Sequence, residues 1–403
     1  MTRMRRQQHG IVAVMVVLAM LVLVFMAALA IDPGRLLISK STLQSAVDAA
    51  ALTAAKIVDA PAADTVEARK TGAQVFHQNI DRYTFFVDRT EPDITFSRTL
   101  NPFVPGSSPP EYVRVIATDY SIWATFSQAL GISKFSTRAS AVAGRSAPIP
   151  EPCDLLPVAV CAVPGAPAPH YGYPTAGEGG HFVTPLKLAS GAAGTTFGPG
   201  NFQLIRVGGM GASVIRENMA GGAVCAPPGG MMEIDPNPGN VVGPVAQGLN
   251  TRFGMYTGPM SGTSDRYPPD CVTTPAPSTP LAFDGTNLTY NGKVITSIGE
   301  IGYTYANYAA DKTCVTGGKP ERRIAAIPIV DCKNKVPGTS GTLPRLGYGC
   351  FFLLQPVVHG SGGDSWIFGE FVDECEASGS PGPTPGQGPY KIVLHDDPDS
   401  DDS

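Results

Sequence analysis

Charge is scarce in this 403-residue chain, in which only 16% of the residues are Asp, Glu, Lys or Arg. The 29 basic residues are outnumbered by 34 acidic ones, which gives a formal net charge of −5. The chain therefore lacks the basic surface with which proteins bind nucleic acid, and we expect no nucleic-acid partner. Disorder of the whole chain is also excluded, because hydrophobic residues make up 43% of the sequence.

Motifs of catalytic sites are also missing. The chain has no G-x-S-x-G, H-E-x-x-H, Walker A or G-x-G-x-x-G pattern. Three scattered histidines, His170, His181 and His359, leave a Ser/His/Asp site open, because such triads assemble from distant positions. Ser361 and Asp364 follow the last of these histidines. No two cysteines have the spacing of a zinc knuckle. We predict a protein that is not an enzyme and that needs no metal or cofactor.

One long apolar run is present. Residues Ile11 to Ile31 carry no charged or hydrogen-bonding side chain. A helix of this length, at about 1.5 Å per residue, spans roughly the 30 Å core of a bilayer. Three arginines precede the run, and arginine stays on the cytoplasmic side. The pattern predicts a cytoplasmic basic tail at 1–10, a transmembrane helix in contact with lipid at 11–31, and the rest of the chain outside the cytoplasm.

A cleaved signal peptide is the alternative interpretation of the same run. Ala28-Leu29-Ala30 would suit a signal peptidase. The run is longer than the 7–15 apolar residues of a typical signal peptide, and no polar segment precedes Ala28. These features favour a retained anchor. Both interpretations deliver the chain to the same compartment.

A second helix is predicted at residues 32–60, next to the membrane. We expect Asp32-Pro33-Gly34 to interrupt the helix at the membrane surface, because proline and glycine break helices. After it, Leu36, Leu43, Ala50 and Ile57 repeat every seven positions in a sequence rich in helix formers, and Val47 and Ala54 lie on a neighbouring line. We call these six residues the heptad stripe. This narrow stripe with small residues suits close helix packing. It could dock on another membrane-anchored helix or pack on its own domain.

Residues 61–146 predict a small α+β domain with the element order α-α-β-β-α-β. The expected elements after the first helix are a helix at Thr65–Asp88, strands at Asp93–Ser97 and Glu111–Thr118, a helical apolar segment at Ile122–Ile132 and a strand at Ser136–Gly144. A proline-rich stretch, 146–152, then forms a stiff linker.

Residues 147–395 predict a loop-rich, mainly β domain. The whole chain contains 46 glycines and 38 prolines, well above the usual combined share of about 12%. Short apolar runs separated by turn residues are typical of antiparallel strands. These runs are Phe202–Val207, Val294–Ile298, Ile324–Val330, Phe351–Val358 and Tyr390–Leu394. The acidic tail, 396–403, is expected to be solvated. The fold class is therefore α+β.

All cysteines lie in this C-terminal part, in an even number. They are Cys153, Cys161, Cys225, Cys271, Cys314, Cys332, Cys350 and Cys375. An even set beyond a membrane anchor predicts disulfides in an oxidising compartment. Eight cysteines allow 105 pairings, among which we favour a local Cys153–Cys161 bridge.

Four stretches of the N-terminus form a recognisable set: RRQQHG before the apolar run, ALAID at its end, then GRLLISKSTLQSA and DAAALTAA. Over about the first 60 residues this set resembles the Tad domain of Flp pilus-assembly TadG-like proteins. Proline 33 and valine 47 depart from the family pattern. The residues that fall at the marked positions of the family pattern are Asp32, Gly34, Arg35, Leu43, Gln44, Asp48 and the run Ala49–Ala55. Together with the heptad stripe they define a candidate interaction helix, whose residues are Asp32, Leu36, Leu43, Gln44, Val47, Asp48, Ala50 and Ile57.

The resemblance implies a membrane-anchored structural component of the Tad machinery, which assembles Flp (type IV-like) pili for adherence. It implies a bacterial inner-membrane location, a single membrane pass and a periplasmic C-terminal bulk. The implied partners are other Tad membrane proteins or a second copy of this chain. An anchored envelope hydrolase or carbohydrate-binding protein that shares only the anchor is the alternative.

The resemblance also allows a comparison with prepilins, which are cut after a glycine that has a glutamate five residues on. Here Gly10 is followed by Met15 at that position. We therefore predict that this chain is not a substrate of prepilin peptidase. The D-x-S-x-S metal motif of some relatives is also absent.

Overall fold

The computed structural model describes residues 9–60, 64–83, 86–188, 203–209, 211–221, 225–227, 230–234, 242–274, 280–333, 341–358, 365–382 and 388–400. The chain divides into two compact units. Unit 1 contains residues 1–59, 63–145 and 392–403, and unit 2 contains residues 60–62 and 146–391. The C-terminal residues 392–403 therefore belong to the same unit as the N-terminal helix.

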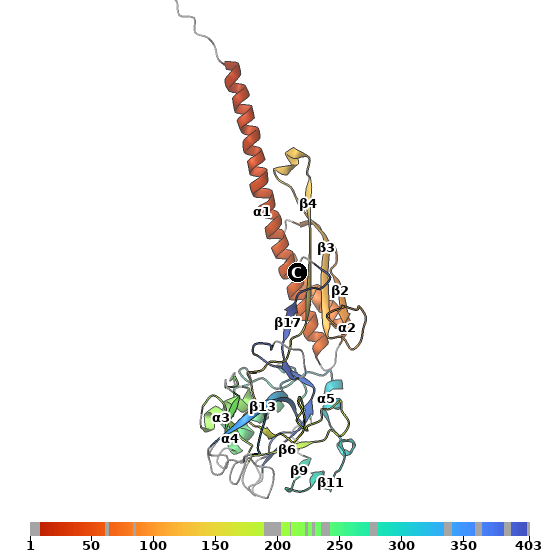
Figure 1. The fold of residues 1–403 in the computed structure, drawn as a ribbon, viewed down its shortest axis with the longest axis vertical. Helices are drawn as coiled ribbons and strands as arrows, with labels where there is room; N and C mark the ends of the chain where they lie inside the picture. Colours follow the sequence, from red (N-terminus) through yellow and green to blue (C-terminus); the bar gives the residue numbers. More distant parts are fainter. Residues whose placement is uncertain are drawn as a thin grey trace, which may run out of the picture. The chain divides into compact units, whose positions relative to one another are not determined.

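Unit 1 begins with one 51-residue helix, α1 (His9–Asp59), which is the long red helix of Figure 1. The predicted interruption at Asp32-Pro33-Gly34 is wrong, because Pro33 lies inside α1. A proline in a helix removes one N–H donor and typically costs about 3 kcal/mol or more. The strong helix formers on both sides favour continuation of the helix through Pro33.

The predicted transmembrane segment forms the N-terminal part of α1. No helix within the described ranges is long and apolar enough to count as a membrane span. The large apolar side chains described between Val12 and Met26 are 48–66% exposed. The side chains at positions 11, 24 and 27–29 of the segment, and the basic tail at 1–8, lie outside the described residues.

The rest of unit 1 is an antiparallel sheet against which α1 packs together with a second helix. Strand order is β1-β3-β4-β17, and β2 also pairs with β3. The long hairpin of β3 and β4 runs alongside α1 (Figure 1). The elements are α2 (Thr65–Ile80), β1 (Phe86–Asp88), β2 (Asp93–Ser97), β3 (Tyr112–Trp123), the 3-10 helix η1 (Ser127–Leu130), β4 (Lys134–Arg145) and β17 (Ile392–His395).

Small residues let α1 and α2 approach closely in the core of unit 1. A Cβ atom added at Gly72 of α2 would stand 3.2 Å from the Ala54 Cβ and 3.2 Å from the Ile94 Cδ1. Ala50 and Ala54 are fully buried on the facing side of α1. Because close packing gains dispersion energy from many short contacts, this small-residue seam stabilises the helix pair.

Two predicted helices of unit 1 need correction. The helix expected at Thr65–Asp88 ends at Ile80, and Phe86–Asp88 is strand β1. The helix expected at Ile122–Ile132 is wrong, because β3 continues to Trp123 and only the short η1 is helical. Ile122 pairs with Phe86 on one side and Phe135 on the other. A short apolar run fits a buried strand as well as a helix, so its pattern alone could not decide.

The C-terminus returns to unit 1 as the strand β17. Its residues pair antiparallel with β4, from Ile392 opposite Arg145 to His395 opposite Val142. Beyond it, the Asp397 carboxylate lies 2.6 Å from the Arg114 guanidinium and is 2% exposed. The expectation of a solvated acidic tail is therefore wrong for Asp397, because a buried arginine of β3 pairs with it. Residues 401–403 lie outside the described residues.

Unit 2 is built on a seven-stranded sheet of order β5-β12-β13-β14-β6, to which β7 and β8 add through β13. All seven residues of β12 and of β14 are buried. Alternate residues of β12 join different apolar clusters, one on each face of the sheet. The strands are β5 (Val160–Cys161), β6 (Thr184–Lys187), β7 (Ile205–Arg206), β8 (Met231–Ile234), β12 (Ile324–Val330), β13 (Thr342–Leu353) and β14 (Trp366–Val372).

Helices and small sheets supply the two clusters. Ile215 and Met219 of α3 join one cluster, together with Val245 of α4. Leu288 of β10 and Tyr308 of α5 join the other. The remaining elements are α3 (Ala212–Ala220), α4 (Val242–Leu249), η3 (Asn250–Phe253), η4 (Gly258–Met260), β9 (Leu281–Phe283), β10 (Leu288–Tyr290), β11 (Lys293–Val294), η5 (Ile298–Glu300), α5 (Tyr305–Ala310), β15 (Glu374–Glu376) and β16 (Gly388–Tyr390). Unit 2 is thus rich in β structure, as predicted.

Disulfides link all eight cysteines, so the predicted framework is confirmed. The pairs are Cys153–Cys225, Cys161–Cys332, Cys271–Cys314 and Cys350–Cys375. The favoured Cys153–Cys161 bridge is wrong. Strand β5 pairs parallel with β12, which places Cys161 opposite Val330 and next to Cys332, 171 residues further along the chain. Sheet pairing, rather than nearness in sequence, decides this bridge.

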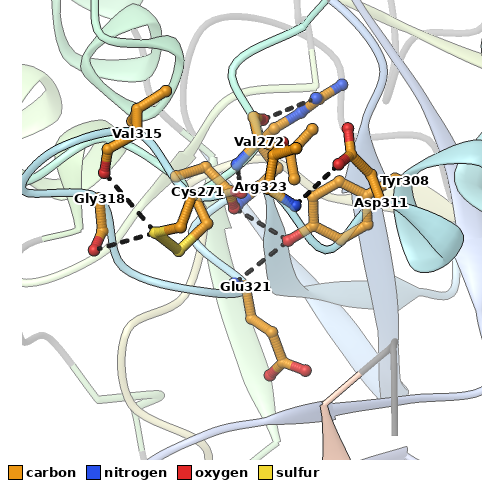
Figure 2. The surroundings of a disulfide bond; sticks show 11 residues. Cys271, Val272, Tyr308, Asp311, Val315, Gly318, Glu321 and Arg323 are labelled. Carbon is orange, nitrogen blue, oxygen red and sulfur yellow. Dashed lines mark hydrogen bonds between the residues drawn. A yellow bond between two sulfur atoms is a disulfide. The ribbon is translucent and has the colours of Figure 1, made fainter. Parts of the chain in front are cut away.

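A buried polar network lies beside the Cys271–Cys314 bridge, and Figure 2 shows Tyr308 and Arg323 next to Cys271. The Asp270 carboxylate accepts hydrogen bonds from the Tyr308 hydroxyl at 3.0 Å and from the Arg323 backbone N–H at 2.8 Å. Burial raises the pKa of Asp270, although these hydrogen bonds oppose the rise. Burial also lowers the pKa of Arg323. The fully buried Arg323 guanidinium also donates to the Leu353 and Leu354 carbonyls. The network ties the disulfide loop to the sheet.

Candidate functional site

Asp32 is the first marked residue of the interaction helix, and it joins α1 to the tip of the β3–β4 hairpin. Its Oδ1 accepts the Thr125 N–H at 3.0 Å, and its Oδ2 accepts the N–H groups of Phe126 at 3.0 Å and Ser127 at 2.6 Å. The carboxylate is 2% exposed. We call these four residues the Asp32 clamp. Three donors on one carboxylate form the anion nest that successive backbone N–H groups can make.

The clamp holds Asp32 in its charged form. Burial alone would raise the pKa of this carboxyl group, but the hydrogen bonds from Ser127, Thr125 and Phe126 outweigh burial and lower the pKa to about 2. Hydrogen bonds to a charged acceptor are stronger than those between neutral groups. The ionised Asp32 is therefore the group that fixes the hairpin tip on α1.

Arg35 strengthens the same junction from the next turn of α1. Its guanidinium donates to the Thr125 hydroxyl, and its carbonyl accepts the Ser39 hydroxyl at 2.8 Å. A Cβ atom added at Gly34 would meet nothing within 4 Å, so packing within the chain does not explain that glycine. Asp32 and Arg35 thus have defined structural roles, and both are positions at which the sequence resembles the Tad pattern.

The heptad stripe of the interaction helix serves its own unit. Leu43, Val47 and Ala50 are 0% exposed in the core of unit 1, and Leu36 and Ile57 are half-buried against that core. Of the two interpretations that the sequence left open, packing on the helix's own domain holds for this stripe. A docking surface made of Leu43, Val47 and Ala50 is wrong, because α2 and the sheet already cover these residues.

Gln44 and Asp48 connect the stripe to β4. The Gln44 side-chain amide donates to the Ser140 carbonyl at 2.8 Å and to the Asp48 carboxylate at 2.9 Å. Burial raises the pKa of Asp48, and the bond from Gln44 lowers it to a smaller extent. The two marked polar residues of the helix therefore fix the position of the long hairpin along α1.

Sequence reasoning missed the outward side of the helix. Leu37 is 69% exposed and Ile38 is 62% exposed, and both follow Ile31, which is 45% exposed. Ser41 and Ser45 continue the exposed side. The exposed apolar pair falls outside the seven-residue repeat, and this displacement from the stripe was the signal available in the sequence. These side chains are free of the unit 1 core and are the better candidates for contact with another molecule.

Two of the candidate catalytic histidines, His170 and His181, lie next to carboxylates. His170 lies 3.8 Å from Glu178, and His181 lies 2.7 Å from the buried carboxylate of Glu370. His359, Ser361 and Asp364 lie outside the described residues. In the part of the chain that the structure describes, no three His, Cys, Asp or Glu side chains gather as a metal site.

Comparison with protein families confirms the resemblance of the N-terminus. Residues 10–58 match the family model Tad, described as "Putative Flp pilus-assembly TadE/G-like". The match covers nearly all of α1, including Asp32 and the exposed pair Leu37 and Ile38. Neither a curated protein nor a solved structure matches the chain. The N-terminal helix thus matches a Tad segment, and the β-rich unit 2 lies outside the matched residues.

Proposed function

We propose that this protein is a non-enzymatic, membrane-anchored component of a Tad (Flp, type IV-like) pilus or secretion machinery. The observation that carries the proposal is the Tad match over residues 10–58. The folded contacts of that segment support it, because Asp32, Arg35 and Gln44 hold the remainder of unit 1 to the helix. The segment is a platform for a folded unit, which suits a structural part of an assembly.

The anchor is the apolar stretch Ile11–Ile31 in the inner membrane, with the bulk of the chain in the periplasm. Exposure of the large side chains between Val12 and Met26 supports this placement, because an apolar helix surface uncovered by its own chain needs another apolar environment. The three arginines before the stretch favour a cytoplasmic N-terminus. Four disulfides in unit 2 fit an oxidising compartment.

The proposed contact with another Tad membrane protein uses Leu37 and Ile38. They are the large apolar side chains on the outward side of α1 directly beyond the anchor, and they lie within the matched segment. A partner helix anchored in the same membrane would run beside α1 and meet them first. Because the exposed serines that follow are small, such a helix could approach closely.

Electron microscopy of a strain that lacks the gene tests the proposal. We expect Flp fibres to disappear while prepilin is still made and processed, and we expect the intact gene to restore them. Unchanged fibres would contradict an assembly role and would reduce the Tad match to a shared anchor. Alkaline carbonate washing tests the anchor separately, because an anchored chain stays with the membranes.

A further inference from the structure

The tip of the β3–β4 hairpin carries exposed apolar side chains that unit 1 leaves uncovered. Trp123, the last residue of β3, is 49% exposed, and Ile132, after η1, is 43% exposed. Lys134 pairs with Trp123 across the hairpin, and its ammonium group lies 4.8 Å from the centre of the indole ring. A tryptophan, an isoleucine and a lysine thus lie together at one end of the sheet.

The Asp32 clamp fixes where this tip lies along α1. The N–H groups of residues 125–127 lie within 3.0 Å of the Asp32 carboxylate. Asp32 directly follows Ile31, the last residue of the apolar stretch. The hairpin tip, which is the connection between β3 and β4, is therefore level with the turn at which the apolar stretch ends. The tip is the end of the hairpin that lies toward the N-terminal part of α1 (Figure 1).

We infer that the tip of the β3–β4 hairpin rests on the outer surface of the bilayer, with Trp123 and Ile132 among the lipid headgroups. The inference rests on the proposed anchor at Ile11–Ile31. The interfacial layer extends roughly 5–8 Å beyond the hydrocarbon core on each side. Trp123 is two residues from the clamped Thr125, and two residues of a strand span about 7 Å. Trp123 therefore lies within the thickness of that layer from the end of the anchor.

The chemistry of the tip selects lipid rather than a protein groove. Tryptophan is enriched at membrane interfaces, where its ring is amphipathic enough to sit between tails and headgroups. Lys134 bonds with Asp88 at 2.8 Å and also lies over the indole ring, and a lysine at this depth can contact anionic headgroups. Two attachments, a helix and a hairpin tip, would fix the tilt of unit 1 on the membrane.

Tryptophan fluorescence tests the inference, because the chain contains only Trp123 and Trp366. The full chain with Trp366→Phe would be reconstituted into vesicles of phosphatidylethanolamine and phosphatidylglycerol that carry brominated acyl chains. We expect quenching of Trp123 by bromines near the headgroups, weaker quenching by bromines near the chain ends, and protection from acrylamide. Asp32→Ala should lose most of the quenching, whereas Asp93→Ala, at an exposed carboxylate of unit 1, should keep it.

A second measurement covers the case in which Trp366→Phe, which alters a buried ring beside Phe283, fails to fold. The quenching lost on Trp123→Phe in the otherwise natural chain then reports the same side chain. Vesicle flotation separates the two proposals. A chain that does not float contradicts the anchor and the inference together. A chain that floats while Trp123 remains unquenched and open to acrylamide overturns only the inference, and protection of Trp123 in native membranes alone would assign the tip to a protein partner.

Discussion

The Asp32 carboxylate accepts the backbone N–H of Ser127 at 2.6 Å, across 95 residues of sequence. This bond and its two neighbours join the end of the apolar stretch to the tip of the hairpin. The marked aspartate of the Tad segment is therefore a structural link between the helix and the sheet, in addition to a polar residue at the end of an anchor.

Replacing Asp32 with alanine should release the hairpin tip. The change leaves three N–H groups without their acceptor, and loss of a buried partner typically costs about 1–3 kcal/mol, or more for a charged one. Hydrogen exchange of the full chain in detergent should show faster exchange at Thr125, Phe126 and Ser127. Asp93→Ala, at an exposed carboxylate of the same unit, is the control. Unchanged protection in Asp32→Ala would show that the clamp contributes nothing.

The clamp should also depend on pH in a defined direction. The pKa of Asp32 is lowered from 3.8 to about 2 in the folded chain, so its stabilisation is complete above pH 3.8 and is lost as the pH falls to about 2. For the amides of residues 125–127, the ratio of the hydrogen-exchange rate in Asp32→Asn to that in the natural chain should be constant from neutral pH down to about pH 4. Below that the ratio should fall toward one, and a ratio that stays constant through this range would argue against the assignment.

The α1–α2 seam predicts opposite results for two glycines of similar helical setting. Gly72→Leu would force a side chain against Ala54 and Ile94, and overpacking usually costs about 1–3 kcal/mol. Gly34→Leu places its side chain in open space and gains about 1 kcal/mol of helix propensity. Thermal unfolding, monitored by hydrogen exchange of the β3 amides, should show a lower unfolding temperature of unit 1 for Gly72→Leu only. Equal effects would mean that the seam is loosely packed.

The disulfide pairing has a direct chemical test. In Cys153→Ser, the thiol that becomes open to alkylation should be Cys225, its partner across the bridge. Peptide mapping without reduction should recover the other three linked pairs unchanged. Alkylation of Cys161 in this variant would instead support the local bridge that the sequence favoured.

The features that the sequence predicted correctly depend on local patterns, whereas the features that it missed depend on residues far away in the chain. The helix at 32–60, the strand at Asp93–Ser97 and the buried run Ile324–Val330 follow local patterns, and the structure has them. The partners of Asp32 and of Cys161 are 93 or more residues away. Such partners depend on strand register, which one sequence does not reveal.

The helix through Pro33 illustrates the same limit. A proline and a glycine in succession predict a break, but α1 continues through both residues, and the Asp32 carboxylate in the same turn accepts hydrogen bonds from a distant loop. The heptad stripe was ambiguous for a related reason. A stripe of Leu43, Val47 and Ala50 shows that one side of the helix is buried, but it does not show whether its own chain or a partner covers that side.

We propose that the Tad segment contributes to pilus assembly through the exposed side of α1, because its own unit already covers Leu43, Val47 and Ala50. The most direct measurement is the number of Flp fibres per cell in a strain that lacks the natural gene and expresses the double variant Leu37→Glu with Ile38→Glu in its place. Val66→Glu, at a 76% exposed residue of α2, is the matched control. The account predicts that the double variant stays in the membrane with unit 1 folded but restores no fibres, whereas the control restores them. Normal fibres from the double variant would contradict it.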